Sequence, residues 1–538
     1  MFRGSNAQII KSIFKNKKTL DQLRLNLKNT SIWEKIAKSW QKTSTKLSSL
    51  GSHSHGNSVT IFNSGDEAFQ AMWDSIENAK ESILLETYTI EMDDIGRKTI
   101  DLLSEAKNRG CNVRFVYDGI GSSSVTDDDL FRLNMLGGST YKFNPVSLFG
   151  RMPFVFRNHR KIMVVDNKIG FCGGMNISAK YATSKIGGSD YFRDTHVMIE
   201  GPAVLDLHRV FHNSMKDNRV ILTGGKTYDS YSPALAAACP FGMTPLDHLY
   251  NSVGNLQYHL YQSEMNSPLF KLDDGHFLFF NELDLFKKKK KCEVVPQHQY
   301  TQLGKGSTQI EPVLQQDEFD TDEFETEEYD DHTEDFEEDE EEDQHKLEDN
   351  TSFVQVQESN LFRNKKSIQK AMIMTLKSSK SHCYFTTPYF LPPKKLRDAM
   401  IEASERGVDV RVLTAGISDV PWIRLASRHI YNKFLSKSVK IYEFNGNRLH
   451  SKTVTIDGIY SSVGSYNLDP WSQRNLEVNL SFINSNVAKQ LEDQFENDLK
   501  ESTEITTETI QNLSLLNKFI CYLAYQFSRI VRPISTFK

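Results

Sequence analysis

The chain is poor in the features that mark several common protein classes. Its six cysteines are scattered over 538 residues with no C-x-x-C pairing, which argues against a disulfide framework and favours a reducing compartment. They are Cys111, Cys172, Cys239, Cys292, Cys383 and Cys521. No run of 18 or more apolar residues occurs, so the sequence predicts no transmembrane helix.

The whole chain also has no excess of basic charge. One short segment holds many of its acidic residues, and without that segment the remaining chain is basic. The chain has 64 Lys or Arg and 70 Asp or Glu, a net charge of −6. Residues 317–349 hold 21 acidic residues and one lysine, which leaves 63 basic and 49 acidic residues elsewhere, a net charge of +14. This basic remainder suits phosphate-containing substrates, an anionic membrane surface or nucleic acid, and charge alone does not choose among them.

What the sequence does contain is one motif in two copies, 291 residues apart. The first copy is His159, Lys161, Asp166, Gly173 and Asn176. The second copy is His450, Lys452, Asp457, Gly464 and Asn467. Five identities at five fixed offsets indicate two copies of one unit, and we interpret each unit as half of a catalytic site.

The residue types in the motif suit chemistry on a phosphate. Histidine and lysine stand two positions apart before an apolar run, which predicts that both lie on one face of a strand. Histidine can act as nucleophile, acid or base near neutral pH. Lysine and asparagine can hold phosphate oxygens. With two copies, one histidine can attack while the other protonates the leaving group, a two-step phosphoryl transfer with a covalent intermediate.

A single H-x-K pair is usually just the polar face of a strand, and a metal site is a second alternative. The lysine in each cluster is a poor neighbour for a cation, so the sequence predicts no metal and no other cofactor. The duplication is what favours the catalytic interpretation over both alternatives.

The two copies of H-x-K-x-x-x-x-D, each followed by G-G/S-x-N, resemble the signature of the phospholipase D superfamily. The stretches 83–96 and 108–122, and their counterparts 382–393 and 405–416, resemble the approaches to the two half-sites. Residues 191–204 and 449–480 resemble the cardiolipin synthase branch in particular. The resemblance covers about 58–215 and 352–500, and it departs from bacterial members at Pro470-Trp471, where they tend to carry an arginine.

The resemblance implies roles for individual residues. His159 would be the nucleophile, and His450 would protonate the leaving alcohol and then deprotonate the acceptor. Asp194 and Glu477 would orient the histidines, although either could be an ordinary surface carboxylate. Lys161, Lys452, Asn176 and Asn467 would hold the phosphoryl oxygens. Asp166 and Asp457 complete the two catalytic sets. We expect these two residues to stabilise the fold around the site rather than to contact the substrate.

The implied function is a cardiolipin synthase-type phosphatidyltransferase that joins two phosphatidylglycerol molecules into cardiolipin and glycerol through a phosphohistidine. The alternative is a phospholipase D-type phosphodiesterase that hydrolyses phospholipid or nucleic acid. A non-catalytic lipid-binding scaffold is a third, which the intact pair of half-sites disfavours. The expected partner is anionic phospholipid at a membrane to which the enzyme binds peripherally. Nucleic acid is not the expected partner, and one chain should supply the whole active site.

Strand-like and helix-like runs alternate in both halves, which predicts an α/β fold. The resemblance makes this two similar α/β/α sandwich domains, related by a pseudo-two-fold axis, with one shared active site. The expected segments are a basic N-terminal arm at 1–57, the first domain at 58–221, an insertion at 222–351, the second domain at 352–500 and a C-terminal amphipathic segment at 501–538. The insertion, with Lys287–Lys291 and the acidic run, is expected to be disordered, either as a solvated loop or as a tether.

The two ends of the chain raise the question of location. Residues 1–50 carry 11 Lys or Arg against Asp21 and Glu34, a composition that resembles a mitochondrial presequence. We therefore expect a mitochondrial, membrane-associated protein from which residues 1 to about 50 are partly removed. The alternative is a basic arm at the cytoplasmic face of another membrane. Residues 515–534 are apolar and aromatic, and they could lie in a membrane interface or pack on the core.

Overall fold

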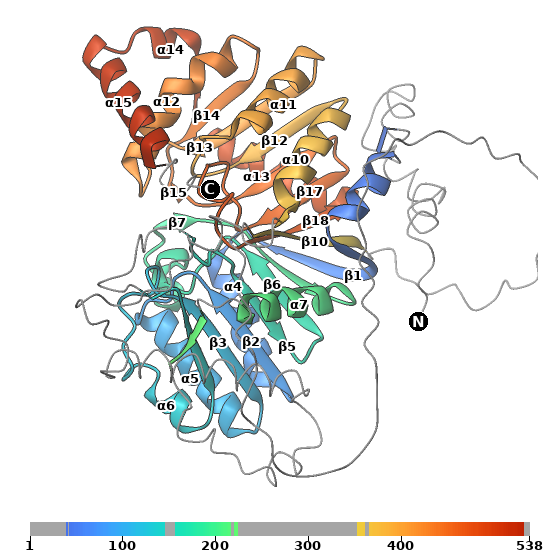
Figure 1. Ribbon diagram of the computed structural model, residues 1–538, viewed down its shortest axis with the longest axis vertical. Coiled ribbons are helices and arrows are strands. Elements are labelled where there is room, and N and C mark those ends of the chain that lie inside the picture. Colours follow the sequence, from blue (N-terminus) through green and yellow to red (C-terminus); the bar gives the residue numbers. More distant parts are fainter. Residues whose placement is uncertain are drawn as a thin grey trace, which may run out of the picture. The chain divides into compact units, whose positions relative to one another are not determined.

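The computed structural model describes residues 39–40, 42–145, 156–216, 220–223, 352–360 and 365–531. Most of the expected insertion, including the lysine run and the acidic segment, lies outside these residues, as do residues 1–38. Within the described part, strands and helices alternate from β1 to β9 and again from β10 to β19 (Figure 1). The prediction of an α/β fold is confirmed.

The first half is built on a mixed sheet. Its strands are β1 (Ser52–Phe62), β2 (Ser82–Thr87), β3 (Asn112–Asp118), β4 (Ser139–Phe143), β5 (Ile162–Val165), β6 (Ile169–Gly173), β7 (Phe192–Arg193), β8 (His196–Glu200) and β9 (Val220–Leu222). Its helices are α4 (Gly65–Asn78), α5 (Asp94–Asn108), α6 (Phe131–Met135) and α7 (Ala203–Met215). The order across the sheet is β9-β4-β3-β2-β5-β6-β8-β1, with β2, β3 and β4 parallel.

The second half repeats this arrangement. Its strands are β10 (Ser352–Asn360), β11 (Lys365–Lys366), β12 (His382–Thr386), β13 (Asp409–Ala415), β14 (Lys440–Phe444), β15 (Arg448–Leu449), β16 (Thr453–Ile456), β17 (Tyr460–Gly464), β18 (Glu477–Ile483) and β19 (Ser502–Ile505). Its helices are α10 (Ser367–Ser378), α11 (Lys394–Glu405), α12 (Pro421–Leu435), α13 (Ser485–Lys500), α14 (Thr507–Gln511) and α15 (Leu515–Val531). The order β19-β14-β13-β12-β16-β17-β18-β10 matches the first half strand for strand. The repeated motif therefore belongs to a repeated fold.

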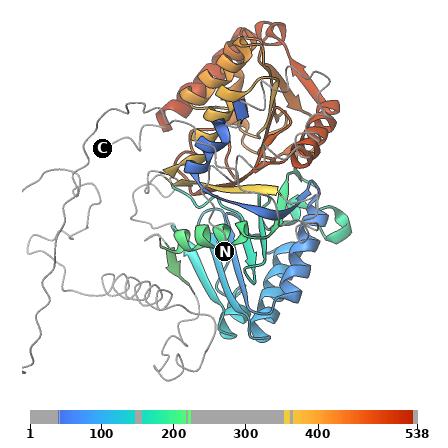
Figure 2. The same cartoon turned by 90° about the vertical axis from the view of Figure 1, so that its right-hand side faces the viewer.

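Strand β1 joins the two sheets into one. Residues 52–57 of β1 pair with β10, and residues 58–62 pair with β8. A shared hydrophobic core forms where the sheets meet, with α7 on one side and the start of α13 on the other (Figure 2). It includes Val197 and Phe211 from the first half and Val356 and Leu480 from the second. The halves are thus fixed against each other by backbone hydrogen bonds and by buried apolar surface.

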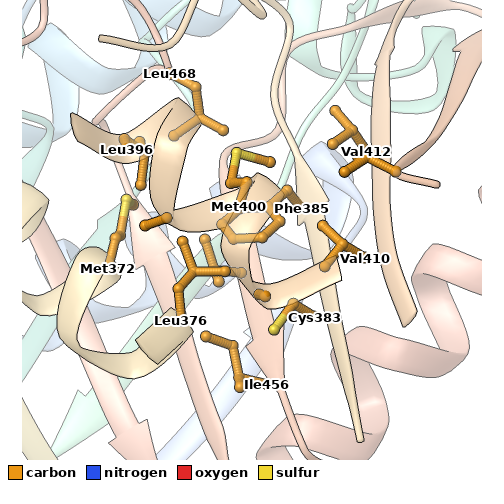
Figure 3. Close-up of a cluster of buried hydrophobic side chains, with 14 of the residues drawn as sticks. Met372, Leu376, Cys383, Phe385, Leu396, Met400, Val410, Val412, Ile456 and Leu468 are labelled. Atoms are coloured by element: carbon orange, nitrogen blue, oxygen red, sulfur yellow. The ribbon is translucent and has the colours of Figure 1, made fainter. Parts of the chain in front are cut away.

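The outer face of each sheet is covered by amphipathic helices. Helix α4 buries Phe69, Met72, Trp73 and Ile76, the i, i+3, i+4, i+7 spacing that places side chains on one face. In the second half the corresponding core lies between α10, α11 and the strands β12 and β13 (Figure 3). With α7 and α13 on the opposite faces, each half is a three-layered sandwich.

The aspartate of each motif is the first of the three residues that form a hairpin turn. Between β5 and β6, Asp166 and Asn167 have φ of 51° and 54°, and between β16 and β17, Asp457 and Gly458 have φ of 57° and 66°. Such turns select Asp, Asn or Gly because other residues are strained at positive φ. The Asp166 carboxylate accepts backbone N–H groups from Lys80, Glu81 and Ser82, all at 2.8 Å. Asp457 does the same with residues 380–382.

The end of the segment expected to be an N-terminal arm packs on the second half. Trp40 is fully buried in the core beside Leu47, in a helical stretch beside α10. Its indole N–H donates to Asp457 Oδ2 at 2.9 Å, and its ring stacks on Tyr460. Strand β1 already begins at Ser52, before the expected domain start at residue 58. The expected cleavage as far as about residue 50 would remove Trp40 and Leu47 from this core.

The C-terminal boundary also differs from the expected one. Strand β19 pairs with β14 beyond residue 500, so the second sheet continues into the segment that the sequence set apart. Helix α15 lies along α12 (Figure 1). Among the helices in the described part of the chain, none has the length and apolarity needed to cross a bilayer.

We predict that Trp40→Ala destabilises the protein by about 3–5 kcal/mol, because it empties a large buried site and leaves Asp457 without its indole donor. Trp40→Phe should cost less, since most of the packing remains. Chemical denaturation followed by circular dichroism measures both. The exposed Leu205→Ala is the matched control. Equal stability of Trp40→Ala and the wild type would show that this segment is not part of the folded core.

Candidate active site

The two motif histidines lie where the halves meet. In both copies the strand begins just after the motif lysine, so histidine and lysine precede β5 and β16 rather than lying within them. The backbone N–H of His159 donates to Leu476 O at 2.9 Å, and that of His450 donates to Arg193 O at 2.8 Å. Strands β7 and β15, from different halves, pair in parallel (Figure 1), and His450 directly follows β15. At His159 the equivalent contact is a single parallel bridge between Asn158 and Leu476. Each histidine is therefore anchored to the backbone of the other half.

The carboxylates that follow these two carbonyls hold the imidazole rings. His159 Nδ1 lies 3.1 Å from Glu477 Oε2, and His450 Nδ1 lies 2.6 Å from Asp194 Oδ2. A carboxylate can only accept, so Nδ1 carries the proton and Nε2 is left for chemistry. The structure thus places each of the two expected acids beside one histidine. In both pairs the acid and the histidine come from different repeats.

The glycines of the motif allow this close approach. An added Cβ at Gly174 would lie 2.2 Å from Asp194 Oδ1, and one at Gly464 would lie 2.3 Å from Asn479 Oδ1. Position 465, which corresponds to Gly174, tolerates a side chain. There the Ser465 hydroxyl donates to Glu477 Oε2 at 2.5 Å. Gly174 therefore makes room for the carboxylate that orients His450, whereas Gly464 makes room for the neighbouring strand β18.

Both motif lysines are buried beside their histidines. Lys161 Nζ donates to His159 O at 2.7 Å, and Lys452 Nζ lies 2.9 Å from His450 Nδ1. Burial lowers the pKa of Lys161 to about 7 and also lowers the pKa of Lys452. A bound anion favours the charged ammonium, so a phosphate entering the site would restore both charges. The charged forms of the two lysines are therefore more stable with a bound anion than without one.

Burial also keeps the histidines neutral. It lowers the pKa of His159, against the opposing effect of Glu477. Burial and the nearby Lys452 lower the pKa of His450 to about 4, against the opposing effect of Asp194. A neutral imidazole with its proton on Nδ1 has a free lone pair on Nε2, which is the form a nucleophile needs.

The two asparagines, expected to act alike, have different surroundings. Asn176 Oδ1 accepts from Thr89 N–H at 3.1 Å, and its Nδ2 donates to Tyr181 Oη at 2.8 Å. Asn467 is buried at the wall of a cavity, and its Oδ1 has no hydrogen-bond partner in the structure. The position that corresponds to Tyr181 in the second repeat is Ser472, which is too small to reach the amide in the same way.

A cavity of about 250 Å³ reaches the site from one side. It opens onto His159 and Asn467, and His450 is not among the residues that line it. The His159 side chain is 12% exposed and that of His450 is 7% exposed. The walls are aromatic and basic, from Tyr88, Phe156, Arg157, Tyr389, Trp471 and Arg474.

Several buried polar residues near the site were not found by sequence reasoning. Arg160, between the motif histidine and lysine, pairs with Glu358 at 2.9 Å and so ties the first motif to β10. Arg157 pairs with Asp118 at 2.5 Å in the cavity wall. Burial raises the pKa of Asp469, which also lines the cavity, to about 7. The N-L-D spacing after Asn467 was the only sequence feature that could have pointed to Asp469.

Metal ligands are not gathered anywhere in the described part of the chain. No group of three or more His, Cys, Asp or Glu side chains there could hold an ion. His208 and His212 have a spacing that can supply two ligands from one helix, and their rings stack at 4.5 Å. The structure brings no third ligand to them among the residues that it describes.

The sequence and the fold both match known proteins. A family model described as "Cardiolipin synthase, PLD-like domain" matches residues 72–213 and 372–499, half of the chain. The probable cardiolipin synthase of Bacillus subtilis strain 168 is 25% identical over 452 residues, 84% of this chain and 67% of that protein. The cardiolipin synthase of Geobacillus sp. strain WCH70 is 26% identical over 483 residues, 88% of this chain and 72% of that protein.

Among solved structures, the phosphatidylserine synthase of Haemophilus influenzae superposes with a TM-score of 0.56 at 13% identity. The superposition covers 91% of this chain and 98% of that one, so the fold as a whole is shared. The two matched ranges of the family model coincide with the two structural repeats, and each contains one H-x-K-x-x-x-x-D motif. The chain therefore belongs to the phospholipase D superfamily, in the family of the cardiolipin synthase PLD-like domain.

Proposed function

We propose that the protein is a cardiolipin synthase-type phosphatidyltransferase. It would join two phosphatidylglycerol molecules into cardiolipin and release glycerol. The observation that carries the proposal is the pair of crossed contacts, His159 with Glu477 and His450 with Asp194, beside a cavity with basic and aromatic walls. The curated relatives named cardiolipin synthase support the choice of substrate.

In the first step, His159 Nε2 attacks the phosphorus of phosphatidylglycerol. The P–N bond forms as the P–O bond to glycerol breaks, and His450 gives its proton to the departing oxygen. That proton requires the imidazolium form of His450. Asp194 favours this form, and so does the negative charge of the bound phosphodiester, against the effect of burial.

In the second step, His450 takes the proton from the glycerol hydroxyl of a second phosphatidylglycerol. The resulting oxygen attacks phosphorus, the P–N bond breaks, and His159 returns to its neutral state. The assignment of His159 as nucleophile is supported by its place on the cavity wall, which His450 does not share. Lys161, Lys452 and Asn467 would hold the phosphoryl oxygens as negative charge develops. Asn176 would act through Tyr181 or after a change of partner.

Asp166 and Asp457 would support the reaction indirectly. Each carboxylate accepts hydrogen bonds from backbone N–H groups at the start of a neighbouring strand. Each aspartate lies at the opposite end of its strand from the motif histidine. They hold the hairpins that carry histidine and lysine into the site. Their place in the motif then follows from turn geometry rather than from contact with substrate.

We further propose that the protein works at a membrane, because both substrates are lipids. The mitochondrial location rests on the basic, acid-poor composition of residues 1–50, most of which lie outside the described residues. The relatives compared above are bacterial and do not bear on it. A fluorescent fusion of the first 60 residues tests the location separately from the chemistry.

The central experiment incubates the purified protein with phosphatidylglycerol labelled in the phosphate. We expect cardiolipin and free glycerol in equal amounts. We also expect an alkali-stable, acid-labile label on His159, as for a phosphohistidine. His159→Ala and His450→Ala should each abolish turnover, whereas His208→Ala, outside the site, should not. Phosphatidic acid as the main product would show hydrolysis instead of transfer. A label that maps to His450 would reverse the roles.

Replacing Asp194 by asparagine tests its positioning role. Turnover should fall about a hundredfold or more, because the amide no longer holds the Nδ1 proton or stabilises the imidazolium. Asp194 raises the pKa of His450, so its loss lowers that pKa further and should move the alkaline limb of the pH–rate profile to lower pH. Asp101→Asn, on the surface, is the control. An unchanged rate and profile would remove Asp194 from the site.

We predict that catalysis needs no metal ion, since two lysines and an asparagine amide already provide the electrostatic stabilisation. Activity in detergent micelles should persist in excess chelator, with phosphatidylglycerol in the micelle as the substrate. Loss of activity in chelator that a single added metal restores would refute this.

A further inference from the structure

Helix α15 presents two different faces, one of which is covered. Cys521 and Ser528 are buried, and Ala524 and Tyr525 pack against the core of the second half. These positions follow the i, i+3, i+4, i+7 spacing of a helix face. The ring of His429, on α12, lies 4.8 Å from that of Tyr525. The helix is therefore docked firmly on α12 and presents its other face outward.

The outward face is strongly apolar. Its large side chains are Leu515, Leu516, Phe519, Ile520, Tyr522, Leu523 and Phe527, which are between 38% and 84% exposed. They make up seven of the twelve large apolar side chains that are exposed in the described part of the chain. A soluble surface rarely gathers so many on one element, so this face is expected to meet another apolar phase.

An aromatic bridge connects this face to the cavity. Phe527 meets Trp422 edge to face at 5.4 Å, and Trp422 meets Trp471 in the same way at 5.3 Å. Trp471 lines the cavity that opens onto His159, and so does Ile423, the residue after Trp422. The exposed face of α15 and the site are thus two ends of one apolar surface.

The charges on α15 fit an anionic surface. The helix contains Lys518 and Arg529, both exposed, and no acidic residue. An apolar face flanked by cations, with tyrosine at its edge, is the pattern of helices that lie in the interface of an anionic bilayer.

We propose that α15 lies in the surface of an anionic phospholipid bilayer, with Leu516, Phe519 and Leu523 among the acyl chains. The Phe527–Trp422–Trp471 bridge then continues the apolar phase to the cavity mouth. A phosphatidylglycerol can move its headgroup to His159 while its chains stay in an apolar environment. The substrate route rests on the proposed function, but the membrane contact of α15 does not.

The test compares the full chain with the double variant Leu516→Glu/Leu523→Glu. Flotation with vesicles of equal parts phosphatidylcholine and phosphatidylglycerol measures binding. We expect binding to fall at least about tenfold, because two exposed leucines that would insert among the acyl chains are replaced by charges that the lipid headgroups repel. The double variant Phe131→Glu/Leu205→Glu changes two equally exposed apolar residues on the first half and should bind as the wild type does.

Activity provides the second readout. The α15 variant should lose most cardiolipin formation from phosphatidylglycerol in vesicles but keep it, within about twofold, with a short-chain phosphatidylglycerol in free solution. This retained activity also shows that the variant is folded. If the wild type makes no cardiolipin from either substrate, the proposed function fails, while flotation still decides the role of α15.

Two outcomes would overturn the inference. Flotation of the α15 variant equal to that of the wild type would show that the membrane contact lies elsewhere. A wild type that is dimeric and a variant that is monomeric, with equal flotation, would assign this face to a second copy of the chain.

Discussion

Each motif histidine is oriented by a carboxylate from the other repeat. The site therefore forms only when the two halves of the chain are packed against each other. His159 depends on Glu477, and His450 on Asp194. An error of about 1 Å in the docking of the halves would break both contacts. The split pairing of β1 and the core beneath α7 are therefore part of the site, although they lie away from it. The constraint explains why so much of the chain serves to fix one interface.

The site gathers basic groups, and an anion favours their charged forms. Lys161, Lys452 and His450 are buried, and the His159 side chain is 12% exposed. Glu477 and Asp194 contact the two histidines. Burial lowers the pKa of each of these basic groups, so the site tends to shed positive charge. A phosphodiester reverses this tendency by supplying negative charge in a region from which water is excluded. The preference of the site for an anion thus follows from burial as much as from the residue types.

The duplicated fold and the histidine, lysine, aspartate, glycine and asparagine of each motif could be predicted because they recur at fixed spacing. Asp194 and Glu477 do not recur in this way, and only the family resemblance pointed to them. The local role of Asp166 follows from turn chemistry, which the sequence also shows. The contacts of Trp40 could not be predicted, because a basic segment with sparse apolar residues does not indicate which of them is buried. The difference between Asn176 and Asn467 was hidden for another reason. It arises from Tyr181, which lies outside the repeated positions and acts through a tertiary contact.

The repeat supplies two equivalent histidines, but the reaction needs two different ones, so residues outside the repeat must make the difference. On one side Tyr181 accepts a hydrogen bond from the Asn176 amide and packs edge to face against His450. On the other side the cavity reaches His159, and Trp471 lines it. Through its contact with Trp422, Trp471 extends the apolar surface of α15 to the cavity mouth. A symmetric scaffold thereby acquires an entrance that lies beside one histidine of the pair, His159.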